Sequence, residues 1–158
     1  MTLKDIQTAE IQAWLKPRPS DCHKGDFGSV GILGGAPGMA GAALLAARAA
    51  LWLGAGRVYA GVLDERIGVD PNTPELMLCS PERALAIEPP GCVVIGPGLG
   101  RSAAAHDWLE QALASAHPLV IDADALNLIA AEPALAQTLA QRQAPSVLTP
   151  HPGEAARL

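Results

Sequence analysis

Short apolar runs alternate along the chain with longer segments that are apolar on one side. The runs are rich in Val, Ile and Leu and lack the polar alternation of a strand with one solvated face. Such runs are typical of parallel strands that are buried on both faces of a sheet. They lie at Ser29–Leu33, Arg57–Leu63, Cys92–Ile95, Leu119–Ile121 and Ser146–Leu148.

Ala-rich segments between these runs predict helices, at Ala40–Leu53, Ala103–Ala116, Ala125–Ala130 and Pro133–Gln143. Gly54-Ala55-Gly56 provides a helix stop, because glycine adopts the left-handed conformation that ends many helices without a steric penalty. Alternating strands and helices predict a parallel sheet with helices on both faces, so the expected class is α/β. Right-handed crossovers then place the loop after every strand at one edge of that sheet.

Two parts of the chain interrupt this pattern. Residues 1–22 are interpreted as an N-terminal unit, in which a helix over Leu3–Leu15 precedes a proline-marked linker, and residues 23–158 as the α/β unit. Asp64–Pro90 is the least regular stretch, with five prolines. We expect it to form a loop with one short strand near Glu75–Cys79.

Composition narrows the class of protein. Of the 158 residues, 49% are hydrophobic but only 3% are aromatic, so the core must be built from Ala, Val, Leu and Ile. The formal net charge is −5 and no run of Lys and Arg occurs, which argues against a nucleic-acid partner or an acidic membrane surface. The apolar segment Leu44–Leu53 contains Arg48 and is too short to span a bilayer. Cys22, Cys79 and Cys92 have no disulfide or zinc spacing, so we expect a reducing cytoplasm.

Glycine-rich segments follow the first and third predicted strands. Gly34–Ala42 opens a helix whose free N–H groups suit a phosphate or another anion, although the segment has neither a P-loop Lys-Ser/Thr nor the GxGxxG spacing. A tight strand-to-helix turn stays open as its alternative role. Gly96–Gly100 has three glycines in five residues, more than a turn needs, and a ligand site is favoured there. Ser102 is placed to cap the next helix.

Polar residues follow the fourth and fifth predicted strands. Asp122, at the end of the fourth, is placed to hold a ribose hydroxyl or a hydrated Mg²⁺, and Asp124 is expected to cap the following helix. Asn127 lies about one turn further and is expected to reach the same cleft. His151, between two prolines, suits hydrogen bonding to a ligand or proton exchange, while Glu154 falls in the first turn of a helix. A solvent-exposed His151 and a helix-dipole role for Glu154 stay open.

Six segments occur in an order that resembles the ADP/ATP-dependent NAD(P)H-hydrate dehydratases, the carbohydrate-kinase-like half of the nicotinamide nucleotide repair enzymes. The ordered set, rather than any single motif, is specific. The resemblance extends to Leu158 and implies a ribokinase-like three-layer α/β sandwich with a mostly parallel central sheet. The segments are His23–Gly28, Gly34–Ala43, Gly54–Gly56, Gly96–Gly100, Asp122–Asn127 and Thr149–Glu154.

The resemblance also implies a function and a set of contacts. Members of the family dehydrate the 6-hydroxy hydrate of NADH or NADPH back to the working cofactor, at the expense of ADP or ATP and with Mg²⁺. Ala42, Gly98 or Gly100, and His151 correspond to contacts with the hydrate substrate. The Asp122–Asn127 segment lies in the family's cleft, so Asp122 and Asn127 join the candidate substrate-binding residues without a fixed role.

The chain departs from the family after the His-Pro-Gly-Glu segment. The resemblance implies a continuation with a Lys-Gly loop and a Gly-Thr-Gly-Asp segment, which supply the nucleotide site and the catalytic base. Neither is present in this sequence. We therefore expect an N-terminal portion of the domain, truncated before its C-terminal part, with no catalytic base, no assigned nucleotide-binding residue and no metal ligand.

The expected partners are the NADH or NADPH hydrate, an adenine nucleotide and a second copy of the chain. A homo-oligomer is expected because a truncated parallel sheet exposes an apolar edge that invites pairing. Two alternatives stay open: a ribokinase-fold kinase for a vitamin precursor or sugar, and a non-catalytic binding module that is stable only as an oligomer. If the chain is a portion of such a dehydratase, the isolated chain is expected to be inactive.

Overall fold

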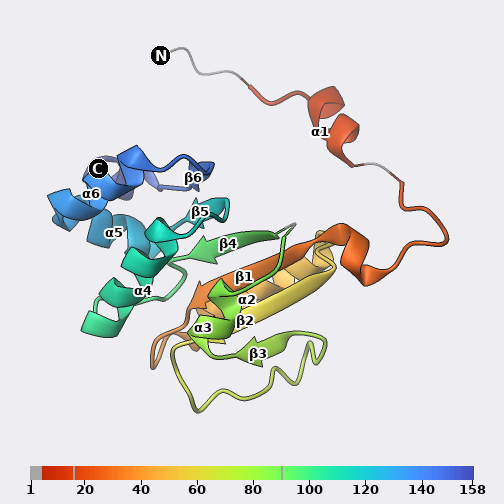
Figure 1. The fold of residues 1–158 in the computed structure, drawn as a ribbon, viewed down its shortest axis with the longest axis horizontal. Helices are drawn as coiled ribbons and strands as arrows, with labels where there is room; N and C mark the ends of the chain where they lie inside the picture. The colour runs from red at the N-terminus through yellow and green to blue at the C-terminus, as the bar shows by residue number, and fades with distance from the viewer. Residues whose placement is uncertain (1–4, 16, 90) are drawn as a thin grey trace.

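The structure is a computed structural model that describes residues 5–15, 17–89 and 91–158. Its centre is a six-stranded sheet in the order β3-β2-β1-β4-β5-β6, and every neighbouring pair is parallel (Figure 1). The α/β class is therefore confirmed, and the sheet is wholly parallel. The strands are β1 (Ser29–Gly34), β2 (Arg57–Val62), β3 (Met77–Cys79), β4 (Gly91–Ile95), β5 (Leu119–Ile121) and β6 (Ser146–Leu148).

Helices lie in the N-terminal region, after β6 and in each connection between strands except that from β2 to β3. They are α1 (Thr8–Trp14), the 3₁₀ helix η1 (Lys24–Phe27), α2 (Ala40–Trp52), α3 (Pro81–Leu85), α4 (Ala103–Ala114), α5 (Ala123–Ala131), α6 (Pro133–Gln141) and α7 (Pro152–Ala155). The sequence did not predict α3, which is short and begins at a proline, a residue that fits the first position of a helix. The prediction of a loop over Asp64–Pro90 is therefore wrong at α3, whereas the short strand predicted near Glu75–Cys79 is confirmed as β3.

The N-terminal helix lies away from the sheet (Figure 1). It is shorter than predicted, because Gln7 precedes its first turn and its backbone N–H donates to the Glu10 carboxylate at 2.9 Å. Leu3, where the predicted helix began, lies outside the described residues. The division of the chain into 1–22 and 23–158 stays a prediction.

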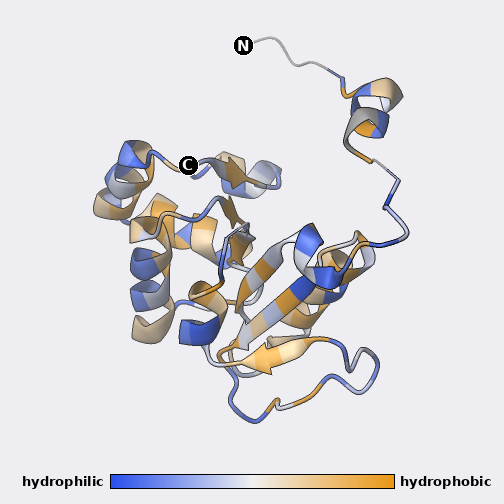
Figure 2. Ribbon diagram, turned by 45° about the vertical axis from the view of Figure 1, so that its right-hand side comes forward, coloured by the Kyte–Doolittle hydropathy of each residue, from blue (hydrophilic) through white to orange (hydrophobic). Residues whose placement is uncertain are grey.

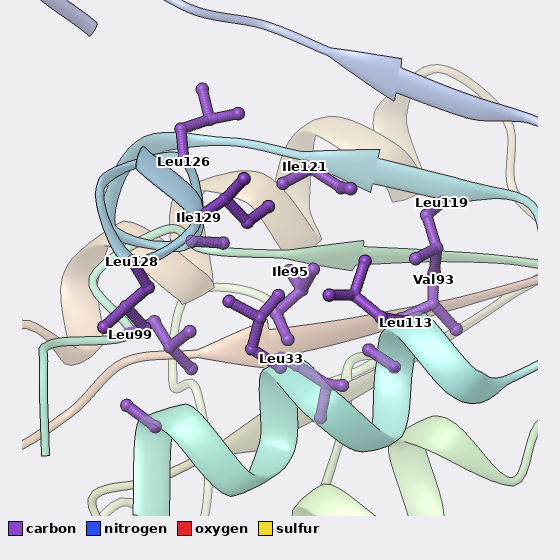
Figure 3. Packing of buried hydrophobic residues seen from close by; sticks show 14 of the residues in the cluster. Leu33, Val93, Ile95, Leu99, Leu113, Leu119, Ile121, Leu126, Leu128 and Ile129 are labelled. Carbon is purple, nitrogen blue, oxygen red and sulfur yellow. The ribbon is translucent and has the colours of Figure 1, made fainter. Parts of the chain in front are cut away.

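Two hydrophobic cores lie on opposite faces of the sheet. Side chains alternate along a strand, so Ile32 belongs to the core under α2 whereas its neighbour Leu33 belongs to the core under α3, α4 and α5. Figure 2 shows orange, hydrophobic bands along the strands, interrupted by paler ones, and Figure 3 shows Leu33, Ile95 and Leu113 among the side chains of the core under α3, α4 and α5. The small side chains Ala43 and Ala47 let α2 approach the sheet closely.

The α2 side of the sheet is only partly covered. The strand register aligns Val94, Val120 and Val147, so the three valines share a face. Val94 and Val120 are half-buried, and Val147 on the edge strand β6 is 56% exposed. This row forms a partly exposed apolar surface that ends at the edge strand β6.

A membrane-spanning helix and a reactive cysteine receive little support from the fold. No helix within the described ranges has the length and apolar character needed to cross a membrane. Cys22, Cys79 and Cys92 are free thiols. Burial raises the pKa of the Cys79 and Cys92 thiols, which makes both poor nucleophiles at neutral pH.

Candidate functional site

The carboxyl ends of β1 and β4 form the point where the chain reverses its direction across the sheet. β1 leads through α2 to β2, whereas β4 leads through α4 to β5 on the opposite side. In open α/β sheets a ligand crevice forms at such a point, because the two loops diverge to opposite faces. Two backbone hydrogen bonds join these loops, from Gly35 N to Pro97 O at 3.0 Å and from Ala36 N to Gly98 O at 2.7 Å. The two glycine-rich segments therefore meet where a ligand is expected.

Gly98 lies against the start of α2. Its φ is +59°, and a Cβ at this position would lie 2.6 Å from the Met39 carbonyl oxygen and 3.1 Å from Ala42 Cβ. Glycine alone allows so close an approach of two backbones. The structure thus brings together Gly98 and Ala42, two of the predicted substrate contacts.

The start of α2 is open to a ligand. Met39 precedes the helix and provides no side-chain cap. The first N–H groups of a helix lack the usual partner four residues earlier, although Ala42 N donates to Met39 O at 3.1 Å, and the helix dipole adds partial positive charge at this end. A Cβ added at Gly38 or Gly41 would meet no atom within 4 Å. Space and donors for an anion therefore coincide beside Gly98.

Asp124 fixes the glycine loop after β4. Its predicted role as the cap of α5 is wrong, because the helix begins at Ala123 and Asp122 occupies the N-cap position. The strand ends at Ile121, so the two carboxylates do not share a strand face, as they would if the strand continued. Asp124 Oδ2 instead accepts a hydrogen bond from Gly100 N at 2.9 Å. Asp124 therefore shapes the loop that carries Gly98, whereas the predicted cap of α4 by Ser102 is confirmed by its bond from Ala105 N at 3.2 Å.

Asp122 links the loops after β5 and β6. Its Oδ1 accepts a hydrogen bond from Thr149 Oγ1 at 2.8 Å, and Thr149 N donates to Ile121 O at 3.1 Å. The next residue, Ala123, has a φ of +46°, in the left-handed region that costs a non-glycine residue about 1–2 kcal/mol. Backbone strain of this kind is concentrated at functional sites.

Asn127 is engaged by the C-terminal segment. Its Oδ1 accepts hydrogen bonds from Arg157 Nε at 3.0 Å and Nη2 at 2.7 Å. A contact between Asn127 and a ligand in the cleft of Asp122 would therefore require Asn127 to leave Arg157. The ligand role of Asn127 stays a prediction. Arg157 itself was not singled out in the sequence, where a solitary arginine carries no signal.

His151 lies at the N-cap position of α7 with a fixed ring orientation. Nδ1 accepts hydrogen bonds from Gly153 N at 3.0 Å and Glu154 N at 3.4 Å, so this nitrogen carries no proton. Nε2 lies 3.2 Å from Glu154 Oε1 and is the protonated nitrogen of the neutral ring. The His151 side chain is 62% exposed, while that of Glu154 is 7% exposed. The predicted first-turn position of Glu154 is confirmed, and it also orients His151.

Gly153→Ala is expected to release the His151 ring from this orientation. An added Cβ would lie 2.9 Å from the ring Cε1 and 3.2 Å from Nδ1, and the exposed ring is free to rotate away. Imidazole ¹⁵N chemical shifts are expected to change from the pattern of one fixed tautomer to that of a mixture. Gly68→Ala is the matched control, because its Cβ meets no atom within 4 Å. Unchanged His151 shifts in Gly153→Ala would show that Gly153 does not hold the ring.

The candidate residues form a row along the sheet edge. Ala42 belongs to the segment after β1, Gly98 to the loop after β4 and His151 to the loop after β6. β1 and β6 are three strand positions apart, which corresponds to about 14 Å at the usual spacing. A ligand that contacts both Ala42 and His151 must therefore be elongated.

A cavity of about 710 Å³ extends the same edge toward β3. Ala36 and Pro37 border it on the β1 side, and Ser102, Ala104 and Trp108 border it on the α4 side. Sequence reasoning missed Trp108. Its spacing of four residues from Ala104 places both on one face of α4, but such spacing occurs throughout any helix and does not mark a cavity.

One group in the described part of the chain, outside this edge, has the spacing of metal ligands. It consists of His106, Asp107 and Glu110 on α4. His106 Nε2 lies 2.7 Å from Glu132 Oε2, and this bond raises the pKa of His106. The contact explains the group as an ion pair that joins α4 to the start of α6.

Known proteins share both the sequence pattern and the fold. Residues 30–158 match the carbohydrate-kinase-type family described as NAD(P)H-hydrate dehydratase. The ADP-dependent (S)-NAD(P)H-hydrate dehydratase of Neisseria meningitidis serogroup B is 41% identical over 91% of this chain and 50% of its own length. The bifunctional NAD(P)H-hydrate repair enzyme Nnr of Escherichia coli K12 is 40% identical over 99% of this chain and 30% of its own length.

Solved structures agree with this match. The ADP/ATP-dependent NAD(P)H-hydrate dehydratase of Bacillus subtilis, co-crystallized with ATP and Mg²⁺, has a TM-score of 0.71 at 29% identity, over 94% of this chain and 53% of that one. The protein SMU.573 of Streptococcus mutans has a TM-score of 0.75 at 30% identity, over 97% and 56%. The ribokinase-like three-layer fold is thereby confirmed. The chain spans about half the length of these structures, and half or less of the curated relatives.

Proposed function

Because this chain belongs to the NAD(P)H-hydrate dehydratase family, we propose that it forms the substrate side of a site that dehydrates the 6-hydroxy hydrate of NADH or NADPH. The observation that carries the proposal is the elongated row at the carboxyl edge, with the Gly98–Ala42 contact at one end and His151 at the other. A dinucleotide is an elongated ligand with an anionic centre. Its shape and charge suit this row.

The pyrophosphate of the hydrate is assigned to the start of α2. Dinucleotide-binding α/β proteins hold a pyrophosphate at a helix N-terminus where glycine lets the backbone approach. Gly98, Gly100 and Ala42 provide the corresponding surface, with the open space at Gly38 and Gly41 beside them. Backbone donors supply the attraction here, which accounts for anion binding by a chain whose formal net charge is −5.

Two side chains are assigned to the neutral parts of the substrate. His151, whose ring is exposed and held in one tautomer, is proposed to hydrogen-bond the hydrated nicotinamide half. Asp122 is proposed to accept a hydrogen bond from a ribose hydroxyl through Oδ2, because Thr149 engages its Oδ1. Asn127 is proposed to join them after exchanging its Arg157 partner.

The co-substrate is proposed to be ADP or ATP with Mg²⁺, as the names of the relatives state for those proteins. The residues of this chain do not fit an adenine nucleotide with its Mg²⁺. The sequence has no lysine after residue 24 and therefore no lysine in a phosphate-binding loop. The edge carboxylates Asp122 and Asp124 are engaged by Thr149 and by the Gly100 N–H.

The purified 158-residue chain is expected to bind the hydrate without converting it, because the residues above supply contacts but no nucleotide site. The test incubates the chain with NADPH hydrate, ADP and Mg²⁺ and follows the near-ultraviolet absorbance of the dihydronicotinamide ring. The bifunctional Escherichia coli enzyme serves as the positive control. An ADP-dependent return of absorbance with the chain alone would contradict the assignment to a substrate side.

A homo-oligomer and a cytoplasmic location are proposed as well. Exposed apolar side chains on the outer face and at the end of α2 support association, with Leu45 65%, Trp52 78% and Leu53 85% exposed. Free thiols at Cys22, Cys79 and Cys92 suit a reducing compartment.

A further inference from the structure

We propose that the cavity beside Trp108 binds the adenine base of the dinucleotide, an assignment that rests on the proposed function. The cavity lies beyond the ends of β2 and β3, between the start of α3 and the first half of α4. Its volume of about 710 Å³ falls within the range of small-molecule sites. The substrate contacts expected from the sequence do not include any residue of this cavity.

The lining favours an uncharged aromatic group over a phosphate. Val62, Leu78 and Pro81 provide apolar walls, and Trp108 provides an aromatic ring. The charged side chains at the cavity are the carboxylates Glu65 and Glu82, and no Lys or Arg lines it within the described part of the chain. Carboxylates repel a phosphate but accept hydrogen bonds from the N–H groups of a base.

The cavity continues directly from the proposed pyrophosphate site. Ala36 borders the cavity and donates its N–H to Gly98 O at 2.7 Å, so one loop joins the two places. β3 is two strand positions from β1, about 10 Å at the usual spacing, and lies on the side opposite to β6. A dinucleotide whose pyrophosphate lies at α2 therefore extends one base toward His151 and the other toward Trp108.

The chemistry of the two rings decides which base lies in the cavity. Hydration of a ring double bond makes both of its carbons tetrahedral, so the hydrated nicotinamide ring is neither planar nor aromatic. Adenine is both, and it stacks on an indole face. Its exocyclic amine donates hydrogen bonds, and the Ser80 hydroxyl holds the pKa of Glu82 below its usual value, which keeps Glu82 an ionised acceptor. Adenine is therefore assigned to Trp108 and the hydrated ring to His151.

Calorimetric titration of the chain with ADP-ribose, NADH hydrate and reduced nicotinamide mononucleotide tests this assignment. Ala104→Phe fills the cavity from an exposed position of α4, and Trp108→Leu removes the stacking surface. Both variants are expected to bind ADP-ribose and the hydrate roughly tenfold or more weakly, with unchanged affinity for reduced nicotinamide mononucleotide. Ala103→Phe adds the same ring at the neighbouring exposed position, which does not line the cavity, and is expected to bind all three like the wild type.

The outcomes separate the two proposals. Wild-type affinity of Ala104→Phe for ADP-ribose would overturn the cavity assignment while leaving hydrate binding in place. Weakened binding of reduced nicotinamide mononucleotide instead of ADP-ribose would place the nicotinamide half here and would overturn it too. Failure of the wild-type chain to bind the hydrate counts against the proposed function, and ADP-ribose still tests the cavity. Circular dichroism of each variant shows whether its fold is intact.

Discussion

Arg48→Met is expected to lower the Tm by roughly 10 °C at neutral pH, because it leaves a buried carboxylate without its partner. Arg48 lies on α2, and Asp70 lies in the loop between β2 and β3 with a side chain only 1% exposed. Arg48 Nε lies 2.6 Å from Oδ2 and Nη2 lies 2.7 Å from Oδ1. The pair therefore fixes the irregular loop to the helix whose N-terminus forms part of the site.

The loss is expected to depend on pH. The hydrogen bonds from Arg48 hold the pKa of Asp70 below its ordinary value of about 3.9. A carboxylate with a lower pKa in the folded state contributes stability above its unfolded pKa, and this contribution is lost as the pH falls through the folded pKa. The difference in Tm between wild type and Arg48→Met is therefore largest above about pH 5 and shrinks below about pH 4.

The double variant Arg48→Met, Asp70→Asn provides the control for the Arg48 prediction. Asparagine has the shape of aspartate without the charge, so this chain is expected to recover part of the lost Tm and to lose the pH dependence. Thermal melts followed by circular dichroism between pH 3 and pH 8 measure both effects. An Arg48→Met chain as stable as wild type at neutral pH would show that the pair does not anchor the loop.

Gly98→Ala is expected to lower the free energy of unfolding by about 3 kcal/mol and to abolish measurable binding of the hydrate. Part of the loss comes from the φ of +59°, which a non-glycine residue adopts at a cost of about 1–2 kcal/mol. The rest comes from the added Cβ, which would lie 2.6 Å from the Met39 carbonyl oxygen. Relief of that contact requires the glycine loop and the start of α2 to separate, which disrupts the proposed pyrophosphate site.

Gly100→Ala is the matched control for stability. Gly100 lies in the same loop with a φ of +75°, but its nearest atoms would lie at 3.4 Å and 3.6 Å from the new Cβ, an ordinary contact. Its free energy of unfolding is therefore expected to fall by about 1 kcal/mol, from backbone strain alone. Urea unfolding of the two variants measures the difference. Equal losses would show that Gly98 is needed only for its backbone conformation.

Most of the fold was predictable from local sequence. The runs over Leu119–Ile121 and Ser146–Leu148 coincide with β5 and β6, because turn residues bound short apolar segments on both sides. The helix over Pro81–Leu85 was missed because it lies in a proline-rich stretch and is too short for a helical period to emerge. The pairing of Arg48 with Asp70 depends on packing between distant segments, which no local pattern reveals.

The candidate site was predictable in its outline but not in its connections. The topology of a parallel sheet brings the loops of Gly98, Asp122 and His151 to one edge. The capping role predicted for Asp124 failed because α5 begins at Ala123, two residues earlier than predicted, so Asp122 occupies the N-cap position. The cavity at Trp108 was missed because its walls come from four separate segments of the chain.

The central claim is that the carboxyl edge of the sheet binds the hydrate of a nicotinamide dinucleotide. Titration of the ¹⁵N-labelled chain with NADH hydrate, followed by amide chemical shifts, tests it most directly. We predict saturable shifts in Gly35–Ala42, Gly96–Gly100 and Thr149–Glu154, with none near Arg142 at the opposite edge. The absence of saturable shifts, or shifts confined to the opposite edge, would contradict the claim.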